Sequence, residues 1–170
     1  FPGLGNGGYD ALDYSIALTV DVATNTINGT TTMLARATQM LGEFNLDLSG
    51  LSVDGATVNG TAVAMDRLGS ELTLILAKPL ENGGLFTTTV TYHGSPTPIA
   101  DTSIPSIPLG WQAQPGGLFV ASEPSGAMNW FPGNNHPRDK ATFTLRIAVP
   151  RPYRVAANGT LKAILDSGGG

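Results

Sequence analysis

The chain has 170 residues, a formal net charge of −4, and only 13% charged residues. This is the length of one ordinary domain, so we expect residues 1–170 to form a single domain around one core. Few charges, together with 22 glycines and 12 prolines, favour short strands joined by turns over long solvated helices. Because the sequence has neither a basic cluster nor a long apolar run, we expect no nucleic acid and no membrane as a partner. Without cysteine the compartment stays open, cytoplasmic or exported.

The first strand is predicted from Tyr14 to Val22, where apolar residues alternate with polar or small ones. Residues 23–29, which read ATNTING, are typical of a turn, and the alternation resumes from Ile27 to Ala35. We therefore expect these two runs to form an antiparallel hairpin.

Four further short strands are predicted between residues 44 and 92. The same alternation marks residues 44–48, 51–58, 72–76 and 85–92. The second of these runs ends at Asn59-Gly60, a pair typical of a hairpin turn. By contrast, the glycine-rich residues 3–8 and the terminal letters SGGG are expected to be flexible.

The second half of the chain is less regular. Residues 94–117 are Pro-rich and aperiodic, which predicts a long surface loop. Residues 141–149 alternate again and predict a strand, and residues 149–161 predict a last strand pair interrupted by two prolines. Together the segments predict an all-β fold, a twisted, saddle-like double sheet or sandwich of about eight to ten short, mostly antiparallel strands.

Residue types needed for catalysis are scarce. Zinc hydrolysis requires two histidines one helical turn apart with a glutamate beside them, but the chain has only His93 and His136, in separate segments. We therefore expect no metal, no other cofactor and no catalytic residue in this chain. Nor does the sequence contain a glycine-flanked nucleophile elbow or a phosphate-binding loop. We interpret His136 and Asp139 as partners of backbone groups.

Residues 122–143, in which a dense irregular loop leads into an alternating strand, carry the most information. They resemble, in order and spacing, the end of the N-terminal β domain in the zinc aminopeptidases of the aminopeptidase N family. The opening residues 3–37 are similar to the first hairpin of bacterial members, and residues 149–161 to their closing strands. The matching loop positions are Glu123, Gly126, Ala127, Trp130, Phe131, Pro132, Asn134, His136, Pro137, Asp139, Lys140, Ala141, Thr142 and Phe143.

This resemblance implies a function for a larger enzyme. In the family, the β domain packs against a catalytic domain that carries the zinc ligands, and peptides bind between the two. The resemblance implies that Glu123, with Gly126 and Ala127, binds the N-terminus of a peptide substrate, and that zinc belongs to the parent enzyme. The chain alone would then be inactive. The remaining matched positions would form a structural loop: Trp130, Phe131, Pro132, His136, Pro137, Asp139 and Lys140.

Four loop positions depart from the family pattern. Met128 stands where the family has arginine, and we expect this change to remove an ion pair that braces the loop. Gly133 replaces a cysteine, Asn135 an acidic residue and Arg138 a small one. The alternative function is a non-catalytic β-sandwich that binds or adheres, because the strand pattern and the acidity fit such a module equally well.

Overall fold

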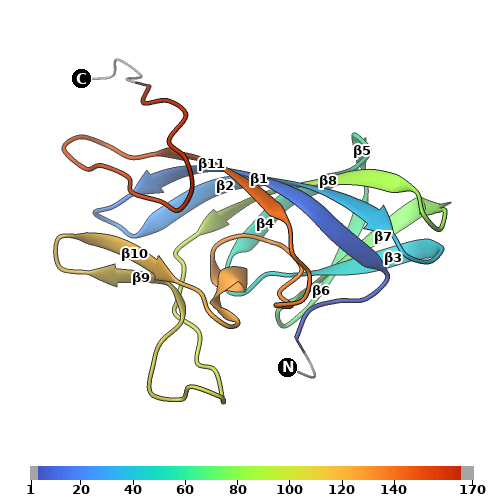
Figure 1. Cartoon of the computed structure of the whole chain (residues 1–170), viewed down its shortest axis with the longest axis horizontal. Helices are drawn as coiled ribbons and strands as arrows, with labels where there is room; N and C mark the ends of the chain where they lie inside the picture. The colour runs from blue at the N-terminus through green and yellow to red at the C-terminus, as the bar shows by residue number, and fades with distance from the viewer. Residues whose placement is uncertain (1–3, 166–170) are drawn as a thin grey trace.

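The largest element of the computed structural model, which describes residues 4–165, is a twisted sheet of six strands (Figure 1). Its strands lie in the order β11-β1-β2-β8-β4-β5. Neighbouring strands pair antiparallel, except for β11, which pairs parallel to β1 at one edge. The strands are β1 (Tyr9–Asp21), β2 (Thr26–Ala37), β4 (Ser52–Val58), β5 (Thr61–Ala62), β8 (Leu85–Gly94) and β11 (Thr142–Ala148).

Two smaller sheets complete the fold. A three-stranded sheet has the order β3-β7-β6, and β9 pairs with β10 in a separate ribbon. The predicted all-β double sheet is confirmed, with eleven described strands, of which β1 and β2 are longer than expected at 13 and 12 residues. The remaining elements are β3 (Leu41–Asp47), β6 (Ala64–Leu68), β7 (Glu71–Leu80), β9 (Gly110–Gln114), β10 (Gly117–Ala121) and the 3-10 helix η1 (Gly126–Asn129).

The core lies between the six-stranded and the three-stranded sheets. Strand β1 buries every second side chain from Tyr14 to Val20, as its alternation predicts. The ring of Phe44 in β3 lies 5.2 Å from that of Phe86 in β8 and 5.6 Å from that of Tyr9 in β1, in edge-to-face contacts. These contacts join the two sheets face to face.

The hairpin turns follow the sequence in one case and not in another. Asn59 and Gly60 both have positive φ (50° and 77°), as a two-residue turn of type I′ between β4 and β5 requires. The turn between β1 and β2, however, ends before Thr26, so Asn28-Gly29 lies within β2. Gly29 is needed there because a Cβ would lie only 2.3 Å from the ring of Tyr92 on β8.

The predicted long loop 94–117 is correct only in its first part. Strand β9 begins within it at Gly110 and pairs with β10 around Pro115 and Gly116, whose φ is 90°. The sequence around this ribbon has no clear alternation because its strands are short and mostly exposed. Hence the pattern of period two, which depends on one buried face, does not reveal them.

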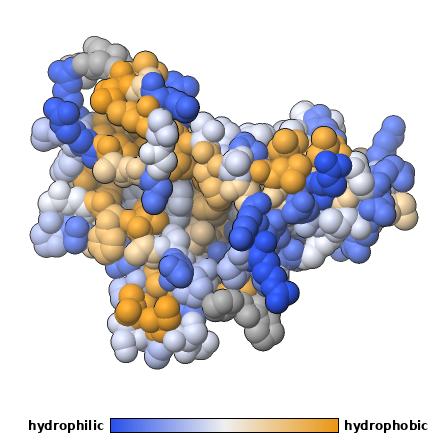
Figure 2. Space-filling model, viewed as in Figure 1, coloured by the Kyte–Doolittle hydropathy of each residue, from blue (hydrophilic) through white to orange (hydrophobic). Residues whose placement is uncertain are grey.

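The predicted last strand pair is wrong. Among the described residues, no strand follows Ala148, and residues 150–165 are exposed. Pro150 and Pro152 remove two backbone donors at the start of this segment, so a ladder cannot begin there. Its exposed apolar side chains include Leu161 and Ile164, and apolar residues gather where the chain leaves β11 (Figure 2, upper left). The terminal SGGG lies outside the described residues.

No helix among residues 4–165 is long and apolar enough to span a membrane.

Candidate functional site

The loop between β10 and β11, residues 122–141, forms the candidate site. It leaves the β9–β10 ribbon, makes the single turn of η1 and runs back to the edge of the six-stranded sheet (Figure 1). A groove of about 260 Å³ lies along this loop. Its walls come from the loop itself and from the aromatic side chains of Tyr14 and Phe143.

Glu123 stands at this groove with an exposed side chain. Its carboxylate forms no hydrogen bond or ion pair with any other described residue, so both oxygens are available to a ligand. Ala127 and His136 line the same groove. The groove therefore brings together Glu123 and Ala127, two of the three residues predicted to bind substrate.

Gly126, the third of those residues, has a packing role in the structure. A Cβ on Gly126 would lie 2.3 Å from the backbone nitrogen of Gly110, so η1 approaches β9 more closely than any side chain allows. Gly110 itself has a φ of 86°, in the left-handed region that favours glycine. The pair of glycines thus fixes the distance between the ribbon and the loop.

Asn129 joins η1 to the ribbon through its side chain. This residue is fully buried, and its amide oxygen accepts a hydrogen bond from the backbone N–H of Trp111 at 2.9 Å. Its amide nitrogen donates to the carbonyls of Thr97 and Trp111, at 2.9 and 3.2 Å. All three bonds satisfy backbone groups that a buried loop would otherwise leave unpaired.

Trp130 and Phe131 anchor the loop with their rings. Phe131 is buried and contacts Trp130 edge-to-face at 4.5 Å, Tyr14 at 5.7 Å and Phe143 at 6.2 Å. The indole N–H of the half-buried Trp130 donates to the hydroxyl of Ser122 at 3.2 Å. Tyr14 in turn stacks on Phe143, so an aromatic row runs from the loop to β11. Pro132, beside Phe131, is buried as well.

The segment 136–140 turns the chain toward β11. The Nδ1 atom of His136 accepts a hydrogen bond from the N–H of Arg138 at 3.1 Å, which leaves the proton of the neutral ring on Nε2. Asp139 accepts from the N–H of Ala11 at 3.1 Å, and burial raises the pKa of its carboxyl. Pro137 and Lys140 are exposed.

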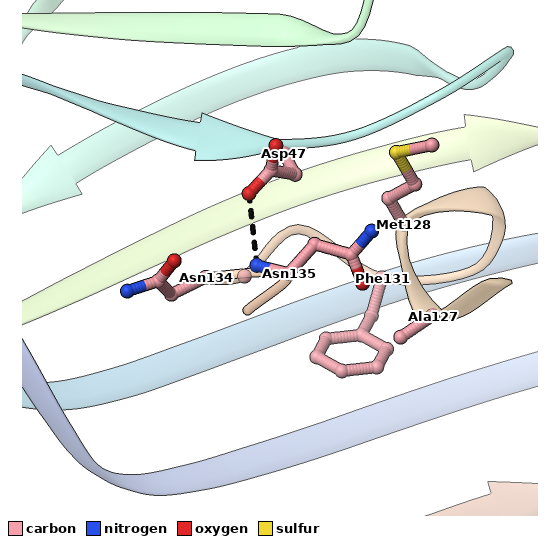
Figure 3. A pocket seen from close by; sticks show the side chains of 7 residues that line it. Asp47, Ala127, Met128, Phe131, Asn134 and Asn135 are labelled. Carbon is pink, nitrogen blue, oxygen red and sulfur yellow. Dashed lines mark hydrogen bonds between the residues drawn. The ribbon is translucent and has the colours of Figure 1, made fainter. Parts of the chain in front are cut away.

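Asp47, the last residue of β3, which the sequence reasoning did not single out, binds the loop through hydrogen bonds. Its Oδ2 atom accepts a hydrogen bond from the backbone N–H of Asn135 at 2.8 Å (Figure 3). The same atom accepts a second bond from the side-chain amide of Asn6 at 3.0 Å. Burial raises the pKa of Asp47 to about 6. The alternation of residues 44–48 did not single it out, because Asp47 lies between Leu46 and Leu48 at a position where a polar residue is expected.

Gly5 and Asn6 take part in the same contacts, which corrects the prediction that this segment is flexible, and Gly3 lies outside the described residues. Asn6 exchanges two hydrogen bonds with Asn134, from its N–H at 2.8 Å and to its carbonyl at 3.1 Å. A Cβ on Gly5 would lie 2.3 Å from the Cβ of His136. These close contacts hold the N-terminal segment against the loop.

Three of the four departures from the family pattern lie together. Met128, Gly133 and Asn135 line a small cavity of about 10 Å³ together with Asp47 (Figure 3). None of the charged side chains in the loop pairs with an opposite charge elsewhere in the described chain. Gly133 packs so tightly that a Cβ would lie 3.0 Å from the Phe131 ring and 3.2 Å from the Tyr14 hydroxyl. Hydrogen bonds and close packing therefore brace this loop.

Within the described residues, no group of three His, Asp or Glu side chains lies close enough to hold a metal ion. Zinc in a catalytic site takes three protein ligands. The residues present do not fit such a site.

The sequence matches no model of a known protein family. Among solved structures, it is similar to an M1 zinc metallopeptidase mutant of Deinococcus radiodurans bound to a Tyr-Ser-Ala substrate, with 33% identity and a TM-score of 0.91. A second structure of this M1 enzyme shows 32% identity and a TM-score of 0.90. The native yeast LTA4 hydrolase, at 24% identity and a TM-score of 0.67 over 85% of this chain, shares the fold.

The coverage of these matches is unequal. The first two comparisons include 99% of this chain but only 39% and 38% of the metallopeptidase chains. The yeast hydrolase is covered to 23%. This chain thus corresponds to one part of a considerably longer polypeptide in each of these proteins.

Proposed function

The chain is related in fold and sequence to the M1 zinc metallopeptidases of the aminopeptidase N family, and we propose that it is the N-terminal substrate-anchoring and scaffold domain of a bacterial zinc aminopeptidase. In this proposal the domain is inactive alone. The parent enzyme removes N-terminal residues from peptides, and this domain holds the free end of the peptide.

The observation that carries the proposal is the position of Glu123. Its carboxylate is exposed at the groove of about 260 Å³ and has no partner among the described residues. A peptide ammonium that leaves water needs acceptors, and a charge-assisted hydrogen bond to a carboxylate contributes about 1.5–3 kcal/mol. An anchor of this kind selects a free chain end, because an amide nitrogen inside a peptide carries no charge.

The catalytic domain is the second part of the proposal. We propose that it belongs to the same polypeptide and supplies the zinc ligands, where a bound zinc ion would polarise the peptide carbonyl. Phe143 is 55% exposed beside the groove, and the apolar surface around it suits contact with another domain. The peptide substrate would lie between the two domains.

A comparison of blocked and unblocked substrates in the full-length enzyme tests the anchor. Glu123→Ala should lower kcat/KM for unblocked peptides by roughly tenfold or more, the loss of one charge-assisted hydrogen bond. Peptides with an acetylated N-terminus, which have no ammonium to lose, should react at the same slow rate as before. Glu43→Ala, which changes an exposed glutamate on β3, is the matched control. Equal losses on both kinds of peptide would refute the anchor.

The alternative of a binding or adhesion module has no specific observation in its favour. The similar structures reported above are metallopeptidases and a hydrolase. A zinc-binding sequence downstream of residue 170 in the same gene would support the peptidase, and a further sandwich domain there would support the alternative.

A further inference from the structure

Asp47 is the last residue of β3 and touches the loop through both its backbone and its side chain. Its N–H donates to the carbonyl of Gly133 at 2.8 Å, and the N–H of Gly133 donates back at 3.2 Å. Its Oδ2 atom accepts from the N–H of Asn135 (Figure 3) and also from the Nδ2 atom of Asn6, which the figure does not draw. One carboxylate oxygen therefore joins the loop to the N-terminal segment.

The contacts continue from Asn135 to the residues beside Glu123. The side-chain amide of Asn135 donates to the carbonyl of Ser125 at 2.7 Å, and Ser125 is only two residues from Glu123. Ser125 is buried and its hydroxyl also donates to Asp101. A second bond, from the N–H of Ser49 to the carbonyl of Met128 at 2.6 Å, ties the same turn to the end of β3.

We propose that Asp47 is a positioning residue, which fixes the Glu123 end of the groove by holding Asn135 and Asn6 against the end of β3. It acts through Asn135 and Ser125 and does not itself reach the substrate. The inference rests on the proposed role of Glu123, but the contacts that it predicts can be measured without any substrate.

The surroundings of Asp47 make its charge state observable. Glu71 faces it in register on β7, and the hydroxyls of Tyr9 and Tyr14 on β1 are titratable groups that interact with its charge. The guanidinium of Arg67 on β6 donates to the carbonyls of Leu48 and Leu51, and Asp47 forms no ion pair with a described residue. Because the carboxyl is buried without a cation, its pKa is about 6, and its titration occurs in an accessible range of pH.

The first experiment follows backbone amides of this chain by NMR. The amide proton of Asn135 should titrate with a midpoint near pH 6 in the unmodified chain and show no such step in Asp47→Asn, whose side chain still accepts. In Asp47→Leu, which cannot accept, hydrogen exchange at Asn135 should quicken about tenfold or more. Asp54→Asn, at an exposed carboxylate on β4, is the control and should change exchange at Asn135 less than twofold.

Two results of this experiment would overturn the proposal. One is an Asn135 amide whose exchange is unchanged in a folded Asp47→Leu chain. The other is an Asn135 amide that still titrates with a midpoint near pH 6 in Asp47→Asn, because that step would then report some other group. This second result decides the test even if the leucine variant fails to fold.

The second experiment connects Asp47 to Glu123 in the full-length enzyme. Asp47→Leu should raise KM for unblocked peptides by roughly threefold to tenfold and leave acetylated peptides unaffected. Combined with Glu123→Ala, it should add little, because the anchor that it positions is already gone. Full additivity would overturn the positioning role. If Glu123→Ala slows unblocked and acetylated peptides equally, the proposed anchor is wrong. The NMR experiment on Asn135 tests the contacts of Asp47 independently of that outcome.

Discussion

In the double sheet the long central strands bury alternate apolar side chains, whereas in the loop between β10 and β11 polar side chains make many of the long-range contacts. Phe44 and Phe86 meet across the two sheets by ring contact alone. Asp47, Asn129 and Asn135, in contrast, are buried polar residues that hold the loop by hydrogen bonds to the backbone. Apolar contacts tolerate a change of partner, while each of these hydrogen bonds requires one particular atom.

The difference has a consequence for function. A site that binds a charged chain end needs polar groups near the groove, and polar groups cannot be buried unless they are paired. The loop therefore carries its own hydrogen-bonded interior beside the apolar core. We expect mutations in the sheet to act on the whole chain, and mutations in the loop to act first on the loop.

The largest effect is expected for Phe86→Ala in the double sheet. Phe86 is buried between Tyr9 and Phe44, so its truncation should leave a cavity and lower the free energy of unfolding by about 3–5 kcal/mol. Denaturant unfolding, followed by circular dichroism, measures this loss. The neighbouring Leu85→Ala, whose side chain is 55% exposed on the opposite face, should change stability by about 0.5 kcal/mol or less.

A second, smaller effect is expected for Asn129→Ala in the loop. The change removes three hydrogen bonds and leaves backbone groups of Trp111 and Thr97 unpaired, which should cost about 3 kcal/mol. The emission of Trp111 and Trp130 should change before the double sheet unfolds, because Trp130 belongs to the loop and the ring of Trp111 in β9 lies 6.4 Å from it. Asn28→Ala, at an exposed asparagine in β2, is the matched control. If fluorescence and circular dichroism report the same unfolding transition in both variants, the loop and the double sheet unfold as one cooperative unit, and this prediction is wrong.

The sequence predicts these two regions unequally. Strands β1 to β4, β7 and β8 follow from the alternation of side chains, because each has one buried face, and the turn at Asn59-Gly60 follows from its residue types. The short strands β5 and β6 are not predicted, because their side chains are mostly exposed. The β9–β10 ribbon escapes this reasoning because its outer residues are exposed, and the segment after Ala148 alternates without pairing.

The site is predicted only in part. The resemblance to the family places Glu123 and the surrounding loop positions, but it does not identify Asp47 or Asn6. Their partners, Asn135 and Asn134, lie 88 and 128 residues away along the chain. Contacts over such distances between single polar atoms leave no periodic pattern in the sequence. Only the folded arrangement brings them together.

The dependence of stability on pH offers a third comparison between the loop and the double sheet. The pKa of Asp47 rises from an ordinary 3.8 to about 6 on folding, so the folded chain binds this proton more tightly than the unfolded chain does. Its contribution to stability is therefore fully present below about pH 4 and is lost as pH rises through about 6, by at most about 3 kcal/mol. Asp139, whose pKa burial also raises, acts in the same direction.

The measurement is a series of unfolding experiments between pH 4 and pH 7 on the unmodified chain and on Asp47→Asn. The asparagine variant should lose most of the slope over this range and be relatively more stable at pH 7. An unchanged slope would assign the pH dependence to other carboxyl groups and would weaken the contrast between the loop and the sheet.

The smallest effect is expected for a carboxylate of the double sheet. Asp54, next to the bulge in β4, pairs with His93 of β8 at 2.8 Å, and both side chains are about half exposed. Because water screens such a pair, Asp54→Asn should lower the free energy of unfolding by about 0.5 kcal/mol or less at any pH. The same unfolding series measures it, and His93→Gln should match it within error. A loss above about 1 kcal/mol would show that a polar contact can also hold the sheet, and the division between an apolar sheet and a polar loop would then have to be given up.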